Sequence, residues 1–292
     1  MCDEKTVKES NEYLGRSDNL TRRQFGTLSA GVGLSMLLPR AANAQAVTET
    51  DVDVTTPDGT ADCYFVHPSA GANPGVVIWP DILGLRPAFR MMGRRLAESG
   101  YSVLVVNPFY RGRRAPVVPE GASFQDDSTR GIVMPLAGAL NAETHVTDAR
   151  AFVSFLDQQE AVDTDRGIGT TGYCMGGPMV MRTAGAIPER VKAAATFHGG
   201  GLVTDAPNSP HLLVPDMTAQ FLFAIAANDD EGDPEAKNVL RETVANAGLQ
   251  AEIEVYEGAM HGWCPPDSAV YNEVQAERAW SRLLVLFESA LA

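Results

Sequence analysis

The stretch best suited to chemistry is Gly172-Tyr173-Cys174-Met175-Gly176. A β-prone run ends directly before it and a helical pattern follows at once, which predicts the strained strand-to-helix turn called a nucleophile elbow. The two glycines allow strand and helix to approach each other closely. The N-terminus of the following helix favours a thiolate at Cys174 and offers an amide donor to an oxyanion. The alternative interpretation is a buried structural cysteine beside a glycine-rich turn.

A thiol nucleophile needs a base, and the base needs a group that orients it. In proteins with this elbow the order along the chain is nucleophile, acid, histidine. Asp229 and His261 each follow a strand pattern, in that order. We therefore expect Cys174, Asp229 and His261 to meet at the carboxyl edge of one sheet. Two alternatives stay open: Asp230 as the acid, with its neighbour a helix cap or a solvated charge, and His198 as the base, although it precedes the acid.

The elements that position these residues alternate between strand and helix patterns. Strands are predicted at 52–55, 61–66, 75–79, 101–106, 166–171, 191–197, 221–226 and 251–256, and helices at 87–99, 143–159, 177–186, 234–247 and from 269. A hairpin followed by β-α-β units predicts an α/β domain over 45–292, with a mostly parallel central sheet and helices on both faces. Residues 107–140 carry no such pattern and are interpreted as an irregular surface insertion over the carboxyl ends of the strands.

Composition narrows the class of protein. The chain has 292 residues, of which 45% are hydrophobic and 21% charged, as in ordinary globular proteins. Its net charge of −14 gives no electrostatic footprint for nucleic acid or for a stable membrane association. The spacing of the four cysteines matches neither a disulfide framework nor a zinc site, so no metal is expected. A Cys63–Cys264 disulfide that leaves Cys174 free stays open as an alternative.

Residues 1–44 are predicted to be a twin-arginine signal peptide. Arg22-Arg23 precedes a weakly apolar core over 25–38, and Ala42-Asn43-Ala44 is a small-residue cleavage site. The apolar core is too short to cross a bilayer. The prediction implies contact with the twin-arginine export machinery and a periplasmic location for the mature domain. The alternative is an amphipathic N-terminal helix.

From about Asp51 to its end, the chain resembles the dienelactone hydrolase family, a cysteine branch of the α/β-hydrolase fold. The matching segments are 78–85, 96–101, 172–177, 228–229 and 261–262. The resemblance implies that Cys174 is the nucleophile, His261 the base and Asp229 the orienting acid. It also implies an oxyanion hole made by the backbone amides of Met175 and Ile82. Family members hydrolyse cyclic enol-lactones without a metal or cofactor.

Three further positions bear on the substrate. The family typically has a glutamate at the position of Asp81, where the carboxylate helps to activate the thiol. It also has an arginine at the position of Pro265, four residues after the histidine. Arg111 matches the family's other substrate-binding arginine and is suited to a charge-assisted pair with a carboxylate. The alternative for Arg111 and its neighbours is a solvated basic loop.

The sequence thus predicts a hydrolase that cleaves a small-molecule lactone or ester through a Cys-His-Asp triad and a thioester acyl-enzyme. Within enzymes, the alternative is a broad-specificity carboxylesterase or thioesterase. Outside enzymes, it is a non-catalytic thiol redox or binding protein on the same scaffold, since an accessible thiolate in the periplasm is open to oxidation and exchange. The intact order of cysteine, acid and histidine argues against this last alternative.

Overall fold

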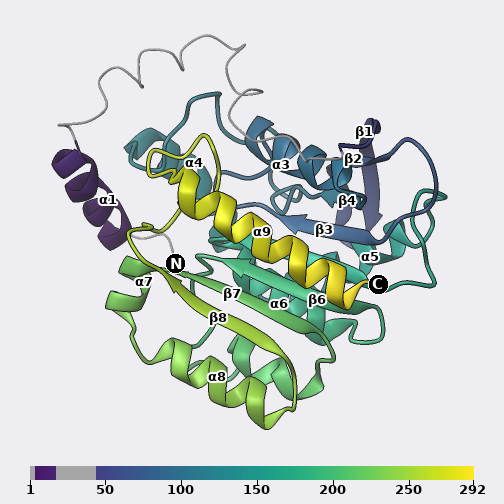
Figure 1. The fold of residues 1–292 in the computed structure, drawn as a ribbon. Helices are drawn as coiled ribbons and strands as arrows, with labels where there is room; N and C mark the ends of the chain where they lie inside the picture. Colours follow the sequence, from purple (N-terminus) through teal and green to yellow (C-terminus); the bar gives the residue numbers. More distant parts are fainter. Residues whose placement is uncertain (1–3, 18–43) are drawn as a thin grey trace.

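Eight strands form a single sheet with the order β1-β2-β4-β3-β5-β6-β7-β8 in the computed structural model, which describes residues 4–17 and 44–292 (Figure 1). The strands are β1 (Val47–Thr56), β2 (Gly59–Pro68), β3 (Gly75–Trp79), β4 (Ser102–Val105), β5 (Ile168–Tyr173), β6 (Val191–Phe197), β7 (Gln220–Ala226) and β8 (Ala251–Tyr256). β1 and β2 run antiparallel to their neighbours, and all other pairs are parallel. The mostly parallel sheet and the α/β class are thereby confirmed.

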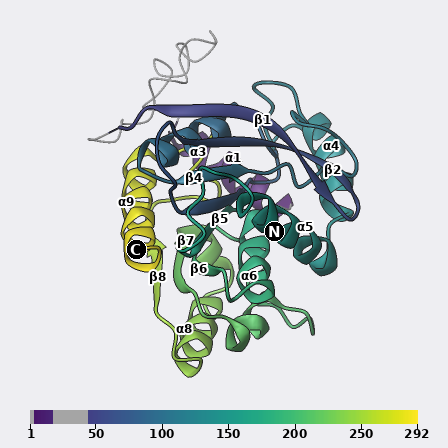
Figure 2. The same ribbon diagram turned by 90° about the vertical axis from the view of Figure 1, so that its right-hand side faces the viewer.

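Helices cover both faces of this sheet (Figure 2). The helices are α1 (Glu4–Ser17), α3 (Pro87–Glu98), α4 (Asp127–Gly138), α5 (Ala142–Leu156), α6 (Gly176–Ala186), α7 (Ala227–Gly232), α8 (Ala236–Asn246) and α9 (Glu273–Ala290), with a 3₁₀ helix η2 at Pro210–Asp216. One core joins α5, α6 and α8 to one face, and a second core joins α3 and α9 to the other. The central strands β3 and β5 are buried along their whole length, as expected between two helical layers.

Local sequence explains where several elements begin and end. Pro87 opens α3 at a position where its missing N–H costs nothing, and Gly100 follows its end at a φ of 100°. Asn141 caps α5: its side chain accepts from the amides of Glu143 and Thr144, and the Thr144 hydroxyl accepts from the backbone amide of Asn141. These caps fix the elements that flank the central strands.

The prediction of irregular structure over 107–140 is wrong in part, because residues 127–138 form α4. The helix contains Gly131 and Pro135, which lower its intrinsic propensity and hide it in the sequence. It forms because one face, with Thr129 and Val133 fully buried, packs on the body of the protein. The predicted location of this insertion, over the carboxyl ends of the strands, agrees with the packing described below.

The twin-arginine motif, the apolar core and most of the cleavage site of the predicted signal peptide lie outside the described residues. Within the first 44 residues the structure describes α1, which precedes Arg22. No helix among residues 4–17 and 44–292 is long and apolar enough to span a bilayer.

Candidate active site

Cys174 occupies a strained turn between β5 and α6. Its φ is +52°, in the left-handed region that residues other than glycine seldom adopt. A Cβ on Gly172 would lie 2.4 Å from the carbonyl oxygen of Gly176, and one on Gly176 would lie 2.4 Å from that of Trp79. The turn is therefore closed only because both positions are glycine. This geometry is that of a nucleophile elbow.

The three side chains predicted from the sequence meet at the carboxyl edge of the sheet. Nδ1 of His261 lies 2.8 Å and 2.9 Å from the two carboxylate oxygens of Asp229. The other side of the His261 ring is hydrogen-bonded to Cys174. Cys174 follows β5, Asp229 lies in α7 directly after β7, and His261 follows β8. Sheet order thus explains why residues far apart in the chain form one line.

The electrostatics of this line favour an imidazolium paired with a thiolate. Burial opposes a charge on His261, but the Cys174 thiolate and the Asp229 carboxylate outweigh it and raise the pKa of His261 to about 10. Cys174 and His261 are 3% and 5% exposed, so water screens their interaction weakly. The arrangement is suited to nucleophilic attack by sulfur at neutral pH.

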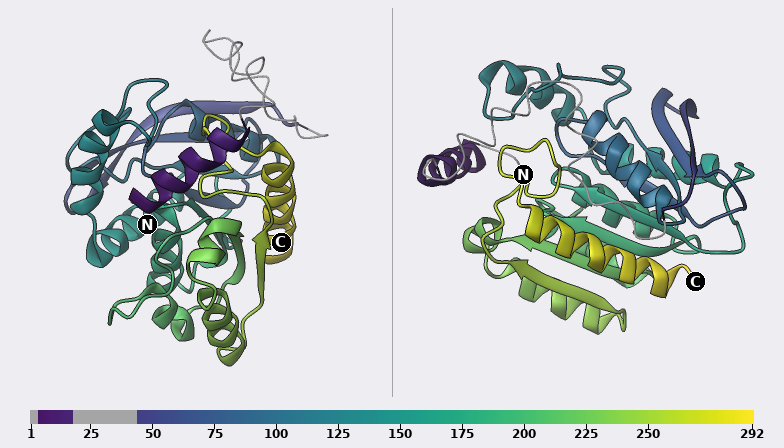
Figure 3. Two further views of the ribbon diagram at one scale, coloured as in Figure 1. Left: turned by 90° about the vertical axis from the view of Figure 1, so that its left-hand side faces the viewer. Right: turned by 45° about the horizontal axis from the view of Figure 1, so that its top comes forward.

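Asn228 anchors the histidine, a role that the sequence analysis missed. Its side-chain oxygen accepts a 2.8 Å hydrogen bond from the backbone amide of His261. Its side-chain nitrogen donates to Glu9 of α1 at 2.7 Å. Helix α1 therefore lies beside α7 at the carboxyl edge of the sheet (Figure 3). The Asn228-Asp229 pair was a signal in the sequence, but only its second member was given a role.

His198, the alternative base, lies behind His261 rather than against the thiol. Its ring centroid is 5.1 Å from that of His261 and 5.0 Å from that of Trp263, both edge-to-face. Neither of its ring nitrogens has a hydrogen-bond partner among the described residues, and burial lowers its pKa strongly. His198 is thus a buried, neutral imidazole that packs against His261. Asp230, the alternative acid, is paired instead with Lys237.

Two backbone amides are candidates for an oxyanion hole. Ile82 and Met175 pack in one cluster with Cys174, and within the described chain neither amide donates a backbone hydrogen bond. Met175 is also the residue before the first turn of α6, where helix amides are unpaired. Both residues pack with Cys174, and the oxyanion hole that the family resemblance implies stays a prediction.

Asp81 lies beside Ile82 in a buried ion-pair network. Arg86 donates to its two oxygens at 2.6 Å and 2.9 Å and to those of Asp267 at 2.7 Å and 2.9 Å. Burial raises the pKa of Asp81, Arg86 opposes that rise, and the nearby Cys174 adds to it. Asp81 is thus electrostatically coupled to the thiol and is held by Arg86. Asp267 follows His261, so the network ties the loop after β3 to the loop after β8.

Arg111, the predicted substrate-binding residue, is engaged by protein carboxylates. Its guanidinium donates to Asp148 at 2.7 Å and 2.8 Å and to Asp58 at 2.6 Å and 3.1 Å. It also stacks on the ring of Tyr110, 4.6 Å from the centroid. The solvated-loop alternative does not describe Arg111, which is half-buried, whereas Arg113 and Arg114 are exposed.

The remaining wall around Cys174 is apolar. We call residues 107–140 the covering segment. Its residues Phe109, Val117, Val118 and Val133 form one buried cluster with Ile82 and Cys174. The sequence analysis placed this segment over the strand ends but did not identify these residues, because no short motif marks them.

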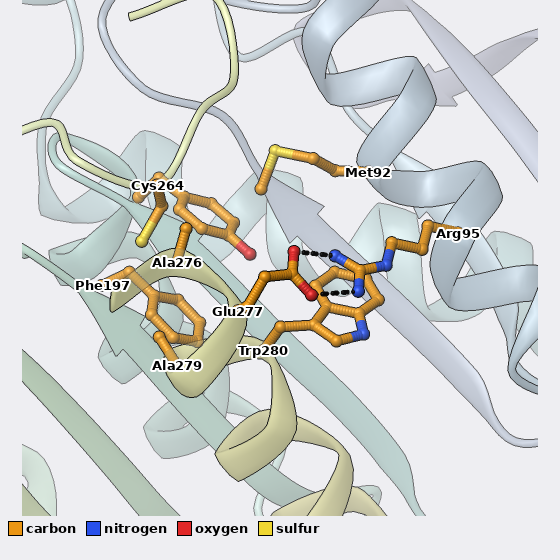
Figure 4. Close-up of a pocket in the computed structure, with 9 residues that line it drawn as sticks. Met92, Arg95, Phe197, Cys264, Ala276, Glu277, Ala279 and Trp280 are labelled. Carbon is orange, nitrogen blue, oxygen red and sulfur yellow. Dashed lines mark hydrogen bonds and ion pairs between the residues drawn. The ribbon is translucent and has the colours of Figure 1, made fainter. Parts of the chain in front are cut away.

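Two hollows in the described residues lie away from Cys174. One, of about 20 Å³, has room for about one water molecule and is lined by Cys264, Tyr173 and the Arg95–Glu277 pair (Figure 4). A second, of about 230 Å³, lies against β1 and β2, and its lining includes Asp51, Asp53, Asp62, Arg90 and Arg114. Neither hollow includes Cys174. The candidate active site is therefore identified by the arrangement of Cys174, His261 and Asp229.

The other two described cysteines differ from Cys174. Cys63 and Cys264 are both unpaired, so the disulfide alternative is wrong. The physical reason is that they belong to the cores on opposite faces of the sheet. Burial raises the pKa of both thiols. No group of three histidine, cysteine or acidic side chains suited to a metal ion occurs among residues 4–17 and 44–292.

The fold and the site together define a class of protein. An elbow cysteine after a central parallel strand, with an acid and then a histidine after later strands, is the arrangement of an α/β-hydrolase. Solved structures agree on the fold. The dienelactone hydrolase from Anabaena variabilis has a TM-score of 0.57 at 18% identity, covering 84% of this chain and 99% of its own. A dienelactone hydrolase-like promiscuous phosphotriesterase from metagenomic libraries has a TM-score of 0.69 at 21% identity, covering 85% and 100%.

Sequence comparison gives the family. The model of the dienelactone hydrolase family matches residues 61–291. A carboxymethylenebutenolidase from Rhodococcus opacus is 26% identical over 240 residues, which cover 80% of this chain and 88% of that protein. The chain belongs to the dienelactone hydrolase family and is a carboxylic ester hydrolase.

Proposed function

We propose that this protein hydrolyses a lactone or ester by acyl transfer through Cys174. The observation that carries the proposal is the hydrogen-bonded line from Cys174 through His261 to Asp229. The family membership supports the same reaction class. A non-catalytic thiol protein has no use for a carboxylate held 2.8 Å from the histidine.

The first step forms the acyl-enzyme. The sulfur of Cys174 attacks the carbonyl carbon, and the resulting oxyanion accepts hydrogen bonds from the amides of Ile82 and Met175. Each such donor contributes about 3 kcal/mol to transition-state stabilisation. The C–O bond then breaks, and the leaving alkoxide takes the proton that His261 carries. A thioester on Cys174 and a neutral imidazole remain.

The second step releases the product. Acylation removes the negative charge of the sulfur, which is a main reason that the pKa of His261 is high. The neutral imidazole is therefore able to take a proton from water, which attacks the thioester. Asp229 stabilises the imidazolium that forms, the C–S bond breaks, and the carboxylic acid leaves. The cycle ends with the thiolate–imidazolium pair restored and needs no other reactant than water.

We further propose that residues 1–44 direct export by the twin-arginine route, so that the reaction takes place in the periplasm. The support is the sequence pattern alone. Fusing residues 1–44 to a reporter protein tests it. Export that is lost when Arg22 and Arg23 are both replaced by lysine supports the route, and unchanged export contradicts it.

The test of the reaction is turnover of a panel of dienelactones, simple lactones and p-nitrophenyl esters. We expect Cys174→Ala to lower kcat/KM by at least about 1000-fold on every substrate that the wild type hydrolyses. Cys264→Ala is the matched control, because it removes a thiol from a different part of the protein. Wild-type turnover by Cys174→Ala would refute the mechanism. Absent turnover with a thiol that still reacts with alkylating reagents would favour the redox or binding alternative.

A further inference from the structure

The acyl site is bounded by a helix face with one chemical character. In α4 the side chains of Thr129, Ile132, Val133 and Leu136 recur at helical spacing and turn toward the protein body. Ile132 and Leu136 pack against the apolar cluster that contains Cys174. Met134 lies on the other side of the helix and is 40% exposed. The face of α4 toward the nucleophile therefore offers hydrocarbon contacts.

Most of the positive charge near this cluster is already neutralised by the protein itself, and Arg113 of the covering segment is exposed to solvent. Arg86 places its donors on Asp81, Asp267 and the Gly84 carbonyl. In the covering segment, Arg111 is held by two carboxylates and Arg114 by Asp53. Arg130 binds Asp127 and the carbonyl oxygens of residues 124 and 125. The residue four positions after His261 is Pro265, which carries no charge.

Negative charge, in contrast, is concentrated around the sulfur. The two networks described above contain three acids, which are Asp229, Asp81 and Asp267. Only two cationic groups pair with them, His261 and Arg86. A substrate that carried its own carboxylate would bring another negative charge next to the thiolate. Its desolvation against this apolar cluster would be uncompensated, because a buried charge without a partner is strongly unfavourable.

We propose that the site takes an uncharged ester or lactone with an apolar acyl group, and that it discriminates against substrates with a carboxylate on the acyl side. This inference rests on the proposed hydrolysis through Cys174 and deepens it. The acyl chain lies against Ile132, Val133 and Leu136 of α4 and against Phe109. Specificity then comes from the covering segment, whereas bond cleavage depends on the strand ends.

The test compares substrates that differ only in charge. p-Nitrophenyl hexanoate and the mono-p-nitrophenyl ester of adipic acid have acyl chains of equal length, and the second ends in a carboxylate. We expect the full chain to have a kcat/KM about 100-fold higher or more for the hexanoate. A second pair, a butyrolactone with and without a carboxylate on an acyl-side ring carbon, asks the same question of lactones and should give the same order.

A charge placed on the inner face of α4 should shift this preference. Ile132→Arg is expected to reduce the ratio of hexanoate to adipate turnover at least about tenfold, by giving the carboxylate a partner. Met134→Arg, on the exposed side of the same helix, adds the same charge and should leave the ratio unchanged. Circular dichroism and thermal unfolding verify that both variants are folded. An equal effect of the two substitutions would assign the preference to net charge and overturn the proposal.

Failure of this inference is distinguishable from failure of the proposed reaction. Equal or faster Cys174-dependent hydrolysis of the adipate ester would overturn the charge discrimination and leave the acyl transfer intact. If Arg111→Ala slows hydrolysis of the adipate ester alone, Arg111 binds the substrate carboxylate. That result would also overturn the charge discrimination. Absence of Cys174-dependent turnover for both members of both pairs would overturn the reaction and this inference together.

Discussion

The carboxyl edge of the sheet and the covering segment lie on two sides of the same sulfur atom and are built differently. At the edge, polar side chains are set by backbone geometry: Cys174 by a strained turn, His261 by the Asn228 bond to its amide. In the covering segment, apolar side chains of α4 and its neighbours are set by packing alone. A hydrogen bond fails when its atoms move by a fraction of an ångström, whereas apolar contacts tolerate such shifts.

The difference teaches where each property of the enzyme resides. In the proposed mechanism, charge stabilisation and proton transfer need fixed distances, so they belong to the ends of strands that the ladder holds in register. In the proposal for α4, substrate choice needs shape and polarity, which a packed helix supplies and which substitutions alter gradually. The following predictions test this division, from the largest effect to the smallest.

The largest effect is expected at the acid of the edge. Asp229→Asn should lower kcat/KM by about 10³-fold, because the amide no longer stabilises the imidazolium or fixes the ring orientation. Asp230→Asn is the matched control, since Asp230 pairs with Lys237 and not with the histidine. Steady-state kinetics on the best ester substrate measures both. If Asp230→Asn proves the more damaging variant, the alternative acid is correct.

Glycine substitutions should separate the two regions by stability. Gly176→Ala is expected to lower the free energy of unfolding by about 3 kcal/mol or more, because its Cβ meets the Trp79 carbonyl at 2.4 Å and backbone atoms give way poorly. Gly131→Ala in α4, with nothing within 4 Å of its Cβ, should stabilise the protein by about 0.5–1 kcal/mol. Urea unfolding measures both. Equal effects would show that the elbow is not strained as described.

The smallest effect is spectroscopic. In a Cys2→Ser background, thiolate absorbance near 240 nm at pH 7 should report Cys174 alone, because burial raises the pKa of Cys63 and Cys264. His261→Gln should reduce this absorbance.

The pKa of His261 is raised to about 10, so its ion pair contributes full stability below about pH 6.5 and loses it as the pH rises through about 10. The stability difference between the two proteins should therefore shrink over this range. A pH-independent difference would contradict the pair.

Much of the edge could be predicted from the sequence. The strands at 75–79, 191–197 and 251–256 have the predicted bounds, since short apolar or alternating runs bounded by turn residues leave little choice. The meeting of Cys174, Asp229 and His261 then follows from a parallel sheet, because the carboxyl ends of its strands share one edge. The conformation of His198, whose φ is +41°, had no local signal, because it depends on packing against His261 and Trp263.

The covering segment could not be predicted in the same way. α4 has glycine at 131 and 138 and proline at 135, so its local propensity favours a loop. Its helical state comes from the packing of one face on the cluster around Cys174, a tertiary effect that no window of residues reports. The Arg86–Asp267 pair was missed for a related reason: the two residues are separated by 181 positions, and neither belongs to a recognisable motif.

That pair has a consequence for how the sequence can vary in evolution. Arg86 is 7% exposed and satisfies two carboxylates on different loops. A lineage that lost Asp267 alone would leave a buried guanidinium half-neutralised, and one that lost Arg86 would leave two acids facing each other without a counter-ion. Positions 81, 86 and 267 should therefore change together or stay together among relatives. Inheritance of the loop after β3 is in this way coupled to inheritance of the loop after β8.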